Sequence, residues 1–202
     1  MKILLVNGSP WNDGNVYLSL KECGKAIEEA GIETEYFHIG NKPVRGCLGC
    51  DRCRELGKCI FDDDILNELV SRMKEADGYV FATPVYYSSP NGALISLLDR
   101  AFYSSSAFFK HKPAAAIAVC RRTGGSASVD CLLKYFTINE MPVASALYWP
   151  VIHGSEKGEA ASDHEGLQIM RSLGANMAFL VKELNGKKRE FNEKREFTNF
   201  IR

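Results

Sequence analysis

The chain has 202 residues, of which 46% are hydrophobic and 25% charged, and its formal net charge at pH 7 is zero. These values are typical of one soluble globular domain with a large core, and the neutral balance argues against a nucleic-acid-binding protein. No apolar run reaches the roughly 18 residues of a membrane span, and the N-terminus is unlike a signal peptide. We therefore expect a cytoplasmic protein that binds neither nucleic acid nor membrane.

Strand-like and helix-like segments alternate along the chain. Five segments have the apolar or alternating character of strands: residues 2–6, 33–39, 78–82, 114–120 and 143–149. Each is followed by apolar side chains at helical spacing, and these helical patterns begin near Val16, Ile65, Leu94, Cys131 and Leu167. The three aspartates at 62–64 directly precede the second helix. We interpret them as its N-terminal cap rather than as metal ligands, because acidic groups are stabilised at a helix start.

This alternation predicts an α/β protein with a doubly wound, flavodoxin-like parallel sheet of five strands. We expect the strand order 2-1-3-4-5, with helices on both faces in three layers. Residues 1–185 would form one domain, which contains a cysteine-rich insert at 40–62. A charged C-terminal tail would occupy residues 186–202.

The loop at residues 7–15 follows the first strand and is rich in glycine, proline, asparagine and serine. Such a loop before a helix is suited to anions, since the first N–H groups of the helix are free. It is neither a Walker loop nor a dinucleotide fingerprint, because it lacks the Lys-Ser/Thr pair and a third glycine. The loops at 83–92 and 121–125 follow two further strands. All three loops should meet at the carboxyl edge of the sheet, where doubly wound folds bind ligands.

The motifs Gly8-Ser9-Pro10 with Gly14-Asn15, and Thr83-Pro84-Val85-Tyr86 leading to Leu98-Asp99-Arg100, resemble the NADPH-dependent FMN reductase family of flavodoxin-like proteins. The resemblance covers essentially the whole chain. It implies an enzyme that passes hydride from NAD(P)H to bound FMN, and then to an acceptor such as a flavin or a quinone. It also implies a homodimer or homotetramer. Residues 198–202 resemble the ending of many members, and we expect from this an ordered tail against a second subunit.

The resemblance to the family implies thirteen cofactor-binding residues in this sequence. They are Ser9, Trp11, Asn15, Val16, Pro84, Val85, Tyr86, Tyr87, Arg121, Arg122, Thr123, Gly124 and Gly125. The first loop would hold the FMN phosphate, residues 84–87 would line the isoalloxazine ring, and residues 121–125 would follow its pyrimidine edge. No side chain is expected to act as a catalytic acid or nucleophile, because the chemistry takes place on FMN.

Two points within this set stay open from the sequence. Strand alternation allows at most one of Tyr86 and Tyr87 to face the flavin, and we expect Tyr86. Arg121 and Arg122 could serve the flavin, a ribose phosphate that would distinguish NADPH from NADH, or only a solvated loop.

The chain also departs from the family pattern in the phosphate loop. Many members have arginine where this chain has Trp11, and threonine where it has Val16. Two usual phosphate contacts are therefore missing, and we expect backbone N–H groups with Ser9 and Asn15 to bind the phosphate. Trp11 could cover the flavin edge or lie in a subunit contact.

Four of the seven cysteines, Cys47, Cys50, Cys53 and Cys59, lie in the long insert. Their spacing is close to that of ferredoxin iron–sulfur loops, and in a flavodoxin-like chain it resembles the iron–sulfur flavoprotein sub-family. The four thiols would then hold a 4Fe-4S cluster, and the protein would act in electron transfer. Structural zinc and free or redox-active thiols are the alternatives. Cys23, Cys120 and Cys131 are interpreted as buried hydrophobic residues.

Overall fold

The computed structural model describes residues 1–187, 191, 193–194, 196 and 198. In this part of the chain the strands are β1 Lys2–Asn7, β2 Glu33–His38, β3 Gly78–Tyr86, β4 Ser89–Pro90, β5 Ala114–Cys120 and β6 Val151–His153. The α-helices are α1 Asn15–Glu29, α2 Cys53–Leu56, α3 Leu66–Glu75, α4 Gly92–Ser105, α5 Gly125–Ile138 and α6 His164–Leu184. The short 3₁₀ helices are η1 Ser106–Phe108 and η2 Glu159–Ser162. Residues 199–202 of the expected ordered ending lie outside the described residues.

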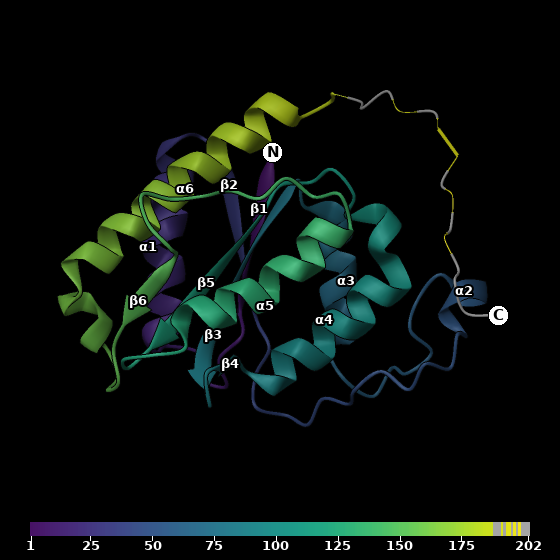
Figure 1. Cartoon of the computed structure of the whole chain (residues 1–202), viewed down its shortest axis with the longest axis horizontal. Coiled ribbons are helices and arrows are strands. Elements are labelled where there is room, and N and C mark those ends of the chain that lie inside the picture. The colour runs from purple at the N-terminus through teal and green to yellow at the C-terminus, as the bar shows by residue number, and fades with distance from the viewer. Residues whose placement is uncertain (188–190, 192, 195, 197, 199–202) are drawn as a thin grey trace.

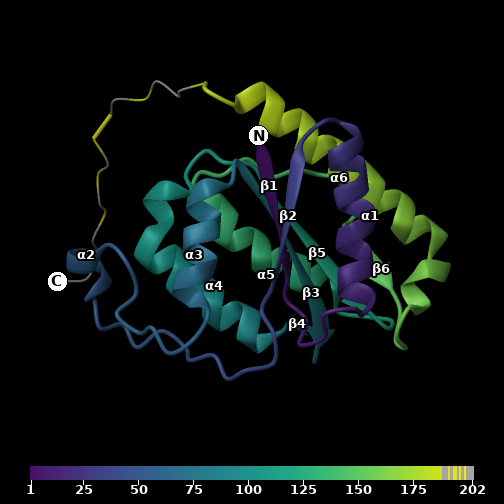
Figure 2. The ribbon, with the colours of Figure 1, turned by 180° about the vertical axis from the view of Figure 1, so that it is seen from behind.

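Five parallel strands form the sheet in the order β2-β1-β3-β5-β6, and β4 pairs antiparallel with the end of β3. Counted along the chain, the parallel strands have the expected 2-1-3-4-5 order, and β4 adds a hairpin. Helices α1 and α6 cover one face of the sheet, and α3, α4 and α5 cover the other (Figures 1 and 2). The doubly wound three-layer prediction is confirmed.

Strand β1 shows why the sheet needs a helical layer on each face. Its side chains alternate between two cores, with Leu4 and Val6 packed among the residues of α3, α4 and α5. Ile3 and Leu5 pack on the other face with those of α1 and α6. All four are fully buried, so the apolar run that predicted the strand also specifies a parallel sheet buried on both sides.

The fifth predicted strand, at residues 143–149, is wrong. Val143 bridges Ala114 of β5, and the next parallel pairing joins Val151 to Ala118. Between these two pairings the chain advances eight residues on the side of Val143, but only four on β5. The extra residues leave the sheet, and Leu147, Tyr148 and Trp149 are exposed. The apolar composition suited a strand, but the spacing of the partners on β5 does not accommodate the segment.

The three aspartates before α3 do not act together as its cap. Only Asp64 accepts a hydrogen bond from the helix start, through Oδ1 from the Leu66 N–H at 3.1 Å. Asp62 accepts from the Asn67 side chain at 2.7 Å, and Asp63 pairs with Arg45 at 2.5 Å. The three carboxylates therefore have three different partners, two at the start of α3 and one in the cysteine-rich segment.

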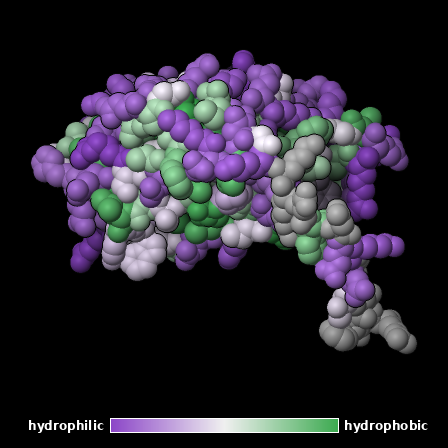
Figure 3. All heavy atoms as spheres, turned by 90° about the horizontal axis from the view of Figure 1, so that it is seen from above, coloured by the Kyte–Doolittle hydropathy of each residue, from purple (hydrophilic) through white to green (hydrophobic). Residues whose placement is uncertain are grey.

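In the described part of the chain, no helix combines the length and the apolar character that crossing a membrane requires. Seen from above, the described surface is mostly hydrophilic, with hydrophobic side chains gathered in patches toward the middle and left of the view (Figure 3).

Candidate functional site

The loop after β1 is held in shape by side chains from its own strand and from β2. Asn7 Oδ1 accepts from the Ser9 N–H at 3.0 Å, and Asn7 Nδ2 donates to the Trp11 carbonyl at 3.1 Å. Ser9 Oγ accepts from the Trp11 N–H at 3.1 Å, which leaves its own hydroxyl proton free to donate. A ring nitrogen of His38 lies 2.9 Å from the Ser9 carbonyl oxygen. The loop is thus preorganised before any ligand arrives.

Asn91 fastens this loop to the neighbouring one, a role that sequence reasoning missed. Its Nδ2 donates to the Gly8 carbonyl at 2.7 Å, while its Oδ1 caps α4 by accepting from the Ala93 N–H at 3.1 Å. Position 8 has no room for a side chain, because a Cβ on Gly8 would lie 2.6 Å from the Ala82 carbonyl oxygen of β3. The loops after β1 and β3 are therefore positioned as one unit.

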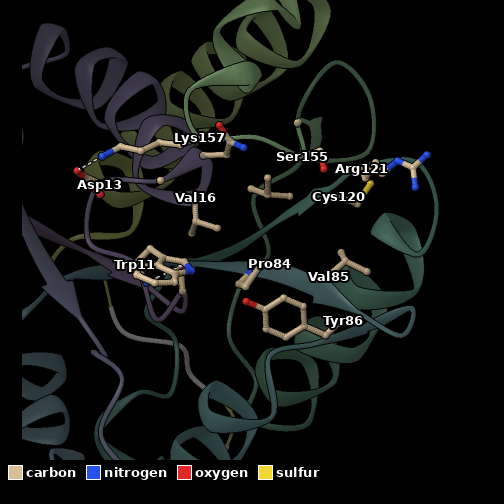
Figure 4. Close-up of a pocket in the computed structure, with 15 residues that line it drawn as sticks. Trp11, Asp13, Val16, Pro84, Val85, Tyr86, Cys120, Arg121, Ser155 and Lys157 are labelled. Atoms are coloured by element: carbon tan, nitrogen blue, oxygen red, sulfur yellow. Dashed lines mark hydrogen bonds and ion pairs between the residues drawn. The ribbon is translucent and has the colours of Figure 1, made fainter.

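The three predicted loops, joined by the loop after β6, surround a cavity of about 680 Å³. This volume is within the range of roughly 300–1,000 Å³ for small-molecule and cofactor sites. Figure 4 shows the cavity between the start of α1 and the ends of β3 and β5. Its lining residues are Ser9, Trp11, Asp13, Gly14, Asn15, Val16, Pro84, Val85, Tyr86, Val119, Cys120, Arg121, Gly154, Ser155 and Lys157.

Eight of the thirteen predicted flavin-site residues line this one cavity. They are Ser9, Trp11, Asn15, Val16, Pro84, Val85, Tyr86 and Arg121. Tyr87 and residues 122–125 do not line it. Sequence reasoning also missed the contribution of Gly154, Ser155 and Lys157, because the fifth strand was placed at 143–149 rather than at Val151–His153.

A tight hairpin explains why only one of the two adjacent tyrosines faces the cavity. Strand β3 continues to Tyr86, and Tyr87 and Ser88 both have positive φ angles, of 50° and 58°, in the two-residue turn before β4. Two positive φ values in such a turn are typical of type I′ hairpins. Tyr86 lines the cavity and is 46% exposed, whereas Tyr87 is fully exposed at 105%. Contact of Tyr86 with the flavin stays a prediction, and Tyr86 is the tyrosine of the pair that lines the cavity.

Residues 122–125 line a second cavity of about 370 Å³ instead, together with Tyr148, Trp149 and His153. Cys120 lines both cavities and is buried, as expected, with 4% of its surface exposed. Burial raises the pKa of its thiol, although the N–H groups of Gly125 and Arg122 act in the opposite direction. Gly124 has φ +85° and lies against Ser88, which holds the loop after β5 on the β3 hairpin.

The start of α1 provides free N–H donors, and the Asn15 side chain, which was expected to bind the phosphate, also has partners within the protein. Gly14 is the N-cap residue, and no side chain caps the helix, so the first-turn N–H groups at Asn15 and Val16 are open to an anion. Asn15 fastens the loop after β6. Its Nδ2 donates to the Glu156 carbonyl at 2.8 Å, and its Oδ1 accepts from the Ala160 N–H at 3.2 Å.

The four cysteines of the insert line one small pocket beside α4, with Arg100 and Tyr103. Burial raises the pKa of the Cys53 thiol, and the neighbouring sulfurs of Cys50 and Cys59 act in the same direction. Among the described residues, no three Cys, His, Asp or Glu side chains are close enough together to hold a metal ion. The four cysteines line one pocket, but their side chains are not gathered closely around one point in this structure.

Arg100 supplies positive charge to this pocket. Its Nη2 donates to Cys59 Sγ at 3.5 Å, and its buried Nε–H has no hydrogen-bond partner among the described residues. A buried donor without a partner beside four thiols is suited to an anionic group in the pocket. The chemistry of the donor set therefore fits an iron–sulfur cluster, which Cys47, Cys50, Cys53 and Cys59 would hold.

The flavodoxin-like sheet reverses its strand order between β1 and β3, and the cofactor-sized cavity lies at the ends of these strands. This arrangement defines a class of cofactor-binding α/β proteins. The family model "NADPH-dependent FMN reductase" matches residues 1–156, and the chain belongs to this family.

Similar proteins agree with this assignment. The chain is 35% identical over 190 residues to an iron–sulfur flavoprotein of Methanocaldococcus jannaschii, covering 90% of this chain and 98% of the other. It is 32% identical over 156 residues to an iron–sulfur flavoprotein of Methanosarcina thermophila, covering 76% and 75% of the two chains. The solved structure of RosB with a bound flavin-derived intermediate has the same fold, with a TM-score of 0.71 and 15% identity over 100% and 93% of the chains.

Proposed function

We propose that the chain is an FMN-dependent oxidoreductase that uses NADH or NADPH to reduce an acceptor such as a quinone or a flavin. Membership of the FMN reductase family supports the flavin-dependent part of this proposal. The single observation that carries it is the convergence of four separate chain segments on one cavity of about 680 Å³. When bound there, FMN would supply the hydride and electron chemistry.

The residues of this chain would bind and orient the cofactor. The first-turn N–H groups of α1 and the Ser9 hydroxyl would donate to the phosphate. Pro84, Val85 and Tyr86 form an apolar wall that would exclude water from the ring (Figure 4). Arg121 would place a positive charge where negative charge develops on the cofactor.

An anaerobic titration tests this function. The purified protein should bind one FMN per chain, and the flavin absorbance should be lost when NADPH or NADH is added. Re-oxidation by a quinone under the same conditions would then identify the class of acceptor. Failure to bind FMN would contradict the proposal. Binding without reduction by either nicotinamide would instead favour an electron carrier.

The cysteine pocket favours a second candidate function, electron transfer through FMN and a 4Fe-4S cluster. It is supported by the shared pocket of four cysteines, by the unpartnered Nε–H of Arg100, and by relatives named iron–sulfur flavoproteins. Arg100 lies nine residues after Asn91, which corresponds to about 13 Å along α4. One helix would thus connect the two candidate sites.

Iron and acid-labile sulfide analysis tests the second candidate. Anaerobically purified protein should contain both, and Cys50→Ser should lose both. Cys131→Ser is the matched control, because Cys131 does not line the pocket, and it should retain the wild-type content. Zinc without sulfide would contradict the cluster and support a structural metal site.

A further inference from the structure

The loop that would receive the FMN phosphate carries a negative charge of its own. Residues 7–16 contain no lysine or arginine, and Asp13 is their only charged residue. Asp13 lines the cavity beside the start of α1. An ionised carboxylate at this position repels a phosphate, and the loop by itself provides no opposing cation.

A cation for this loop is supplied by a residue that is distant in the sequence. Lys157 also lines the cavity, and its Nζ forms an ion pair with Asp13 Oδ2 across 144 residues of sequence (Figure 4). This hydrogen-bonded ion pair lowers the pKa of the Asp13 carboxyl, so Asp13 is ionised at neutral pH. Arg121, the other cationic residue that lines the cavity, lies at the opposite end of the view in Figure 4.

The backbone around Lys157 is fixed in place. Asn15 binds the Glu156 carbonyl and the Ala160 N–H on either side of it. Glu159 Oε2 accepts from the N–H groups of Ser155 and Glu156 at 2.7 and 2.9 Å. The lysine side chain is nevertheless 69% exposed, so its ammonium group can exchange one partner for another while its backbone stays in position.

We propose that Lys157 is the phosphate-binding cation of the flavin site and exchanges Asp13 for the terminal phosphate of FMN. This inference rests on the proposed function. An exposed ion pair contributes little to stability, so breaking the contact with Asp13 costs little. A phosphate carries more negative charge than a carboxylate and offers more acceptor oxygens, so it is the stronger partner. Lys157 thereby replaces the arginine that many family members have at the position of Trp11.

A comparison of FMN with riboflavin isolates this contact, because the two ligands differ only in the phosphate. Dissociation constants of both would be measured by fluorescence titration of flavin-free protein. In Lys157→Met, affinity for FMN should fall roughly tenfold while affinity for riboflavin stays unchanged. Asp13→Asn should bind FMN more tightly and riboflavin as before. Lys25→Met is the matched control, because Lys25 is similarly exposed, at 67%, and is ion-paired to Glu29 away from the cavity.

The outcomes separate this inference from the function on which it rests. A wild-type protein that binds neither flavin overturns both. A wild-type protein that prefers FMN, with the same preference retained in Lys157→Met, overturns the role of Lys157 and leaves the flavin site intact. Equal loss of both flavins in Lys157→Met, with the wild-type unfolding transition, also overturns it, because the contact would not be with the phosphate.

Discussion

Arg100 and Asp64 form an ion pair in which both side chains are almost completely buried, with exposed fractions of 2% and 5%. Arg100 also donates to the carbonyls of Arg45 and Phe61, at 3.2 and 3.5 Å. These two residues flank the four cysteines. One arginine of α4 therefore holds both ends of the cysteine-rich segment against the domain.

Loss of Arg100 should strongly destabilise the protein. Arg100→Met keeps much of the side-chain volume but leaves the carboxylate of Asp64 buried without its partner, which typically costs about 3–5 kcal/mol. We expect the free energy of unfolding, measured by urea denaturation, to fall by that amount. Arg52→Met removes an exposed pair with Glu55 and should cost less than about 1 kcal/mol. Equal effects of the two variants would show that the buried pair is not important for folding.

Asn15 should matter for the loop after β6 more directly than for the cofactor. Asn15→Ala removes two hydrogen bonds to backbone groups of that loop, and we expect a loss of about 1–2 kcal/mol in unfolding free energy. Amide hydrogen exchange at Ala160 should become faster, since its N–H loses its acceptor. Asn12→Ala, at an exposed position in the loop after β1, is the control. Unchanged exchange at Ala160 would contradict this role.

The two neighbouring tyrosines should differ in their effect on flavin affinity. Tyr86→Leu removes an aromatic ring from the cavity wall, and FMN affinity should fall about fivefold, which corresponds to roughly 1 kcal/mol. Tyr87→Leu changes a ring that points into solvent from the hairpin turn and should leave affinity unchanged. The measurement is a fluorescence titration with FMN. The reverse order of effects would place the flavin on the other side of the hairpin.

Asp163 should make stability depend on pH in the acidic range. Burial favours its neutral form, but the Gly166 and His153 N–H groups that donate to the carboxylate lower its pKa below the usual 3.8. A lowered pKa means that the stabilisation is present above about pH 3.8 and is lost as the pH falls through the lower, folded-state value. The free energy of unfolding of wild type should exceed that of Asp163→Asn by up to about 1 kcal/mol at pH 6, and by less at pH 3. The asparagine can still cap α6, but it lacks the negative charge that the helix start and the His153 N–H stabilise.

Urea denaturation at the two pH values measures this difference. Asp130→Asn, an exposed position on α5, should show no comparable change between them. A difference between wild type and Asp163→Asn that stays constant from pH 6 to pH 3 would contradict the contribution of the Asp163 carboxylate.

The sequence by itself determined the sheet and the position of the site. Residues 3–6, 78–82 and 114–120 are all buried, on both faces of the sheet, and the continuous apolar character of each run indicates this burial locally. Because parallel strands end at one edge, the loops after them had to converge there. Ser9, Val16, Pro84 and Arg121, which lie in or beside these loops, line one cavity at this edge.

Only the tertiary structure decided which residues act on one another across long separations. Residues 143–149 have the composition of a strand, but whether they pair depends on the spacing of their partners on β5. Likewise, Lys157 meets Asp13, and Arg100 meets Asp64 and Cys59, only because the domain folds back on itself. Burial leaves a periodic pattern in the local sequence, whereas an ion pair or hydrogen bond between distant residues leaves none.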